Sequence, residues 1–183
     1  MISLSRSDSS ILGRWWWTVD RVMLLAFLIL ISFGVLMAMA ATPMVANRIG
    51  IEELYFLKRH LLYIFPSLLV IFFVSILDNS DIKKFALVLF FISLFFTIMA
   101  IFFGSEIKGA KRWISIFGFS MQPSEFVKPA LLVITAWMLS EQQNNSEFRG
   151  KFLASVFFLS FVFVLVLQPD IGMIIITTAV WFG

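Results

Sequence analysis

The 183-residue chain is 61% hydrophobic and only 14% charged, whereas soluble proteins carry roughly 25% charged residues. A globular core of this size cannot hide that much apolar surface, so most of the chain is predicted to face lipid. The net charge of +3 suits anionic headgroups or lipid phosphates better than nucleic acid. With no cysteine and a single histidine, His60, a disulfide framework and a thiolate metal site are excluded.

The order of polar and apolar segments predicts an all-α polytopic membrane protein that forms one membrane domain over residues 1–183. A polar N-terminal segment, 1–21, contains tryptophans beside arginines, a pattern typical of interface anchors. We predict transmembrane helices at about 22–41, 61–77, 85–103, 123–140 and 152–167, and an incomplete sixth at 171–183.

Prolines and helix lengths refine this prediction. Pro43 is assigned to the loop after the first helix, whereas Pro66 is expected to kink the second helix without ending it. Pro123 suits a first helical position, and Glu125 suits the positive end of the fourth helix's dipole. The last run, 171–183, gives about 20 Å of helix, short of the roughly 30 Å hydrocarbon core. We therefore expect the chain to be the N-terminal portion of a longer protein.

Counting membrane crossings places a group of polar residues on one side of the predicted bundle. The start of the fourth helix offers unpaired backbone N–H groups, which suit a phosphate, and residues three apart on that helix can form an ion pair. We expect a polar pocket near one leaflet that accepts an anionic lipid headgroup. The candidate residues are Lys108, Lys111, Arg112, Gln122, Ser124, Glu125, Lys128, Gln168 and Asp170.

Simpler interpretations stay open for each part of this group. The basic residues from Lys108 to Arg112 are alternatively solvated loop charges that bind phospholipid nonspecifically. The Glu125–Lys128 pair is alternatively structural, and Asp170 is alternatively an interfacial helix cap. No Ser–His–Asp set, metal-binding box or Walker motif occurs in the sequence. Lysines and arginines are also nearly balanced between the two sides, so the positive-inside rule does not fix the orientation.

Three motifs resemble the signature of the SEDS family (shape, elongation, division and sporulation proteins). They are Gly109–Ile114 with Gln122–Glu125 and Lys128, then Gln168–Gly172, and the N-terminal stretch Gly13–Arg21. The N-terminal stretch is more similar to the cell-division members than to the cell-elongation members. The resemblance covers the whole chain, and the motifs are specific only in combination.

The resemblance implies a fold of about ten helices with cytoplasmic termini, in the bacterial inner membrane at the division septum. It implies a peptidoglycan glycosyltransferase that polymerises lipid II with a class B penicillin-binding protein and other division proteins. The family's proposed catalytic aspartate lies in a later outer loop, so no catalytic residue is assigned here and this chain alone is expected to be inactive. No cofactor is expected, although a divalent cation could accompany the lipid diphosphate. The alternatives are a lipid II flippase and a non-catalytic scaffold that recruits a synthase.

Overall fold

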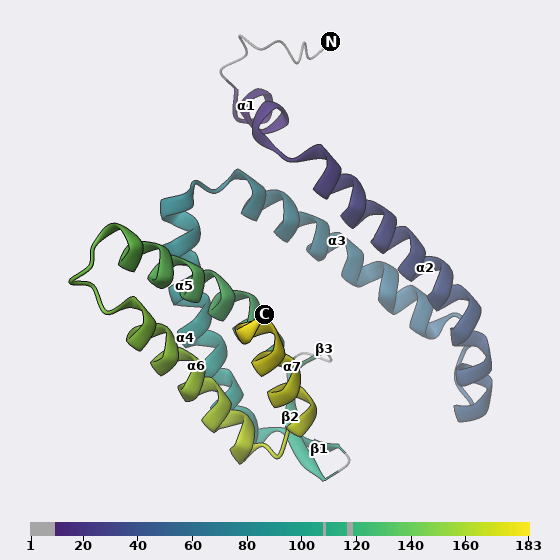
Figure 1. Ribbon diagram of the computed structural model, residues 1–183. Coiled ribbons are helices and arrows are strands. Elements are labelled where there is room, and N and C mark those ends of the chain that lie inside the picture. The colour runs from purple at the N-terminus through teal and green to yellow at the C-terminus, as the bar shows by residue number, and fades with distance from the viewer. Residues whose placement is uncertain (1–9, 108, 117–118) are drawn as a thin grey trace. The chain divides into compact units, whose positions relative to one another are not determined.

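The computed structural model describes residues 10–107, 109–116 and 119–183 (Figure 1). The internal contacts of the chain divide it into two units, Met1–Leu77 and Asp78–Gly183. Among the described residues, four helices are long and apolar enough to cross a membrane. They are α2 (Arg21–Ile49), α3 (Tyr55–Ile76), α4 (Asn79–Phe103) and α6 (Gly150–Leu167).

The first unit contains three helices: α1 (Ile11–Thr18), α2 (Arg21–Ile49) and α3 (Tyr55–Ile76). Ser10 caps α1, because its hydroxyl accepts a hydrogen bond from the Gly13 N–H at 3.0 Å. The sequence pattern predicts no helix in the N-terminal segment 1–21 and so misses α1. Residues 1–9 of that segment lie outside the described part. The Trp15 indole N–H donates to Ser75 Oγ at 2.7 Å and thereby joins α1 to α3.

The bounds of α2 and α3 correct the predicted ones, because α2 continues through Pro43 to Ile49. Proline removes one backbone hydrogen bond, but a membrane helix tolerates the loss where local adjustments satisfy the freed carbonyl. The helix ends instead at Gly50, whose φ of 72° suits a left-handed C-cap. Helix α3 begins six residues before the predicted residue 61, at Tyr55, so three basic or potentially basic residues, Lys58 to His60, lie inside a helix.

The second unit contains four helices: α4 (Asn79–Phe103), α5 (Ser124–Asn144), α6 (Gly150–Leu167) and α7 (Ile171–Phe182). Helix α4 begins before the predicted residue 85, because the charged segment after Asp78 is helical and not a turn. The predicted helix at 85–103 therefore gains a polar first turn, with Asp81 near the positive end of its dipole.

Three short strands connect α4 to α5: β1 (Ser105–Ile107), β2 (Ala110–Ile116) and β3 (Phe119–Met121). They form an antiparallel sheet in the order β1-β2-β3, with Glu106 opposite Lys111 and Ser115 opposite Ser120. Gly109, with a φ of 78°, lies in the turn between β1 and β2. The predicted all-α architecture is correct for the membrane helices, but the segment treated as a loop is a small sheet.

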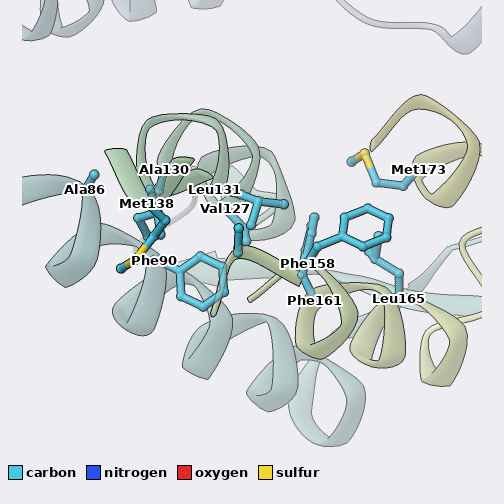
Figure 2. Close-up of a cluster of buried hydrophobic side chains, with 12 residues drawn as sticks. Ala86, Phe90, Val127, Ala130, Leu131, Met138, Phe158, Phe161, Leu165 and Met173 are labelled. Carbon is cyan, nitrogen blue, oxygen red and sulfur yellow. The ribbon is translucent and has the colours of Figure 1, made fainter. Parts of the chain in front are cut away.

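The apolar core of the second unit forms where α4, α5 and α6 pack together, and α7 adds Met173 (Figure 2). Phe90 of α4 packs edge-on against Phe157 of α6, with the ring centroids 5.0 Å apart. Helix α5 contributes a buried stripe at helical spacing: Ser124, Val127, Leu131, Ile134 and Met138. This packing brings the ends of α4 and α6 and the starts of α5 and α7 to the same end of the unit as the sheet.

Candidate functional site

Arg112 on β2 reaches the turn between α6 and α7. Its Nη2 donates a hydrogen bond to the Pro169 carbonyl at 2.8 Å, and its Nε lies 3.3 Å from Asp170 Oδ2. The contact between Nε and Oδ2 is an ion pair that lacks hydrogen-bond geometry. The buried Nε atom therefore has no hydrogen-bond partner. The Arg112 side chain is 32% exposed and that of Asp170 only 9%. The ion pair therefore joins the sheet to the start of α7, with a buried carboxylate and a partly exposed guanidinium.

Asp170 has a second role as the N-cap of α7. Its Oδ1 accepts a hydrogen bond from the Met173 N–H at 3.3 Å, while Oδ2 accepts one from Gln122 Nε2 at 3.4 Å. Both carboxylate oxygens are thus engaged. The contact with Met173 agrees with the interpretation of Asp170 as a helix cap. The contact with Gln122 agrees with its place in a polar cluster.

Gln122 and Ser124 connect the sheet to the start of α5. The Gln122 Nε2 group donates to Ser124 Oγ at 3.1 Å in addition to Asp170. Ser124 is the first residue of α5 and is 1% exposed. The chain after β3 is therefore held against the α6–α7 turn through one carboxamide.

Gln168 is also buried, at 2% exposure. Its Nε2 donates to the Thr97 carbonyl of α4 at 2.9 Å and to the Lys111 carbonyl of β2 at 3.3 Å. The Oε1 atom is buried without a hydrogen-bond partner. One side chain thus contacts two segments that are more than fifty residues away in the sequence.

Glu125 and Lys128 form the predicted ion pair, with Lys128 Nζ 2.7 Å from Glu125 Oε2. The two side chains differ in burial, because Glu125 is 53% exposed and Lys128 only 24%. The reason is the helical period of α5, because its buried stripe runs through Ser124 and Val127 and leaves position 125 on another face.

A cavity of about 240 Å³ lies between the β1–β2 hairpin and the end of α6. Its lining includes Glu106, Lys111 and Gln168. The Lys111 side chain is exposed, and no ion pair to it is found among the described residues. An ammonium group at a small open cavity can bind an anionic group, while Glu106 limits the net positive charge there. Lys108 lies outside the described residues.

Arg59 is a further polar residue that the sequence interpretation left in a loop. It lies in α3 of the first unit, where its Nε and Nη1 donate to the hydroxyls of Tyr63 and Tyr55, each at 3.4 Å. Tyrosines four residues on either side of an arginine in an apolar run would have indicated this arrangement. Arg59 lies near the start of α3, where a long basic side chain can reach the headgroup region. Among the described residues, no group of three or more His, Cys, Asp or Glu side chains could hold a metal ion.

Comparison with known proteins decides the family. The model of the FtsW/RodA/SpoVE family, described as a cell cycle protein, matches residues 20–183. The chain belongs to this family. The resemblance drawn from the three motifs is therefore confirmed, and it extends over almost all of the chain.

Two relatives show how far the similarity reaches. The chain is 36% identical over 177 residues to the probable peptidoglycan glycosyltransferase FtsW of Caulobacter vibrioides, covering 96% of this chain and 45% of that protein. It is 29% identical over 157 residues to the stage V sporulation protein E of Bacillus subtilis, covering 84% of this chain and 43% of that protein. The chain thus spans less than half the length of these relatives.

Solved structures support the fold. A chain of a peptidoglycan synthase complex, described for its coordination of polymerization and crosslinking, matches with a TM-score of 0.59 at 24% identity, covering 82% of this chain and 45% of that one. The rod shape determining protein RodA of Thermus thermophilus matches with a TM-score of 0.56 at 22% identity, covering 80% of this chain and 48% of that one. At these identities the match establishes the polytopic helical fold.

Proposed function

We propose that this chain supplies part of a peptidoglycan glycosyltransferase that polymerises lipid II during cell division. The observation that carries the proposal is the polar cluster of Arg112, Gln122, Gln168 and Asp170 beside a cavity with an exposed Lys111. The relative from Caulobacter vibrioides, named as a probable enzyme of this class, supports it.

Lys111 is the residue of this cluster best suited to touch the lipid diphosphate. When a sugar is transferred from a polyprenyl diphosphate, negative charge grows on the departing diphosphate, and a fixed cation stabilises that charge. Arg112 is already paired with Asp170 and bonded to the Pro169 carbonyl, so its role is to hold β2, and with it Lys111, in place against the α6–α7 turn. A resident cofactor is not part of the proposal, and any divalent cation would arrive with the diphosphate.

The transfer step itself is assigned to residues outside these 183. Two carboxylates near the cavity, Asp170 and Glu125, are committed to other contacts, since Asp170 pairs with Arg112 and Glu125 with Lys128. Neither is placed as a free base. We therefore propose that this chain alone forms no glycan polymer, and that the complete enzyme builds the remaining wall of the site from its later helices.

The proposed setting is the inner membrane at the division septum, with a cytoplasmic N-terminus and the polar cluster on the outer side. A class B penicillin-binding protein is the proposed partner. The similarity to a chain of a peptidoglycan synthase complex supports this partner. The four helices of spanning length support the membrane setting.

The test compares Lys111→Ala and Arg112→Ala with Arg149→Ala in the full-length protein, assayed with its partner for polymerisation of lipid II. Arg149 directly precedes α6 at its opposite end, so it is a matched loss of positive charge. We expect at least a tenfold lower rate for the first two variants. Lys111→Ala removes a charge-assisted contact to phosphate, whereas Arg112→Ala removes the ion pair that holds β2 in place. Equal rates for all three variants would refute the phosphate role. Movement of lipid II across vesicles without any polymer would favour the flippase.

A further inference from the structure

We propose that the Gln168 carboxamide is a positioning residue that fixes β2 against α4 and so sets where Lys111 and Arg112 lie. The proposal rests on the function proposed above only for its activity readout. Its structural part concerns the geometry of the second unit alone.

The contacts of Gln168 are directional. Its Nε2 has two hydrogens, and each faces a backbone carbonyl, that of Thr97 at 2.9 Å and that of Lys111 at 3.3 Å. A flipped amide would place Oε1 against both carbonyl oxygens, so the donor orientation is the only one that suits this position. Both partners are main-chain atoms, and therefore the contacts fix the path of the backbone.

The position of Gln168 explains why these contacts matter for the sheet. The backbone N–H of Gln168 already closes α6 by donating to the carbonyls of Val164 and Leu165. Its side chain is not needed to end the helix and instead contacts α4 and β2, which are distant in the sequence. Among the described residues, two side chains make polar contacts between β2 and the α6–α7 turn. Gln168 donates to the Lys111 carbonyl, and Arg112 contacts the Pro169 carbonyl and Asp170.

Burial strengthens this argument. Gln168 is 2% exposed, whereas the Arg112 side chain is 32% exposed. Water competes for the arginine contacts but not for those of the carboxamide. Loss of the Gln168 contacts should therefore let the hairpin shift against the helices even while Arg112 keeps its charge.

The main variant is Gln168→Glu, which has the same shape but replaces the donor group with an oxygen that faces two carbonyl oxygens. Gln168→Met removes the donor without adding charge and serves as the second variant. Gln142→Glu is the matched control, because Gln142 uses its Oε1 to accept from the Lys151 N–H at 2.7 Å and glutamate retains that oxygen.

The geometry is measured in the full-length protein with pairs of spin labels, since these 183 residues contain no cysteine to interfere. One pair joins Ser115 of β2 to Leu159 of α6, and a reference pair joins Leu139 of α5 to Leu159. All three positions are exposed. We expect the Ser115–Leu159 distribution to become at least twofold broader in both Gln168 variants, while the reference pair keeps its width.

Polymerisation of lipid II is measured on the same samples. We expect a fall of about tenfold or more in both Gln168 variants and none in Gln142→Glu, because a misplacement of about 1 Å can cost about a hundredfold in rate. An unchanged Ser115–Leu159 distribution overturns the proposal whatever the activity. So does broadening of both label pairs, or a failure of both Gln168 variants to fold, because Gln168 would then be a general stability residue. A broadened sheet distance in protein that never polymerises lipid II supports the positioning role and counts against the proposed function.

Discussion

Replacing Asp170 tests whether the carboxylate at the start of α7 holds the polar cluster together. In the native chain it caps α7 through Met173, accepts from Gln122 and pairs with Arg112. Asp170→Ala removes all three contacts. Asp170→Asn keeps an oxygen for the cap but removes the negative charge.

The magnitudes follow from burial. Loss of a cap costs about 1 kcal/mol, and breaking a buried ion pair costs about 3–5 kcal/mol. Because the Arg112 side chain is about one-third exposed, water compensates part of that second cost. We therefore expect Asp170→Ala to lower the free energy of unfolding by about 2–4 kcal/mol and Asp170→Asn by about 1–2 kcal/mol.

The control is Asp81→Ala, which removes a carboxylate 3.5 Å from Lys84 Nζ on the exposed face of α4. The two side chains are 55% and 76% exposed, and such pairs contribute about 0–1 kcal/mol. The assay is reversible unfolding of the full-length protein in mixed micelles, titrated with a denaturing detergent. If Asp170→Ala costs no more than Asp81→Ala, or if the Asn and Ala variants are equal, the account of Asp170 as both cap and ion-pair partner is refuted.

Two further predictions concern helix contacts elsewhere in the chain. A Cβ at Gly150 would lie 1.9 Å from the Met138 carbonyl oxygen, so Gly150→Ala should cost about 1–3 kcal/mol or more in the same assay. A Cβ at Gly172 would lie 4.0 Å from Asp170 Oδ1, an ordinary contact distance, so Gly172→Ala should change stability by no more than about 1 kcal/mol. The hydrogen bond from Trp15 to Ser75 should give a coupling of about 0.5–1.5 kcal/mol in a double-mutant cycle of Trp15→Phe and Ser75→Ala. A coupling near zero would contradict the docking of α1 on α3.

The sequence predicts the membrane helices well because lipid requires long uninterrupted apolar runs. Its errors fall at the helix ends. Helix α2 passes Pro43, and α3 and α4 begin within charged segments. Long basic side chains near a helix end can reach the headgroup region, so charge there does not end a membrane helix. Hydropathy alone therefore places the middle of such helices better than their ends.

The gathering of polar residues at one end of the second unit is also predictable, because it requires only a count of crossings between α4 and α7. The individual contacts are not. Arg112 reaches Asp170 only because β1, β2 and β3 form a small sheet between α4 and α5. A seven-residue strand of mixed character gives little signal against the surrounding apolar runs. Glu125 shows the opposite case, since its pairing with Lys128 depends on local spacing and is confirmed, whereas its exposure depends on which face of α5 is buried.

This difference bears on how the site works. Lys111 pairs with Glu106 and Trp113 with Ser105, so Arg112 is the extra residue of an irregularity in the β1–β2 ladder. The structure uses the two adjacent cations differently. Arg112 turns toward the membrane helices, where Asp170 neutralises it, while Lys111 lines the cavity beside Gln168. Of the two adjacent cations, Arg112 thus stabilises the fold, and Lys111 is free to bind an anion. The two alanine variants should accordingly differ in kind: Arg112→Ala should lower both stability and polymerisation, whereas Lys111→Ala should lower polymerisation and leave the free energy of unfolding within about 0.5 kcal/mol of the native value.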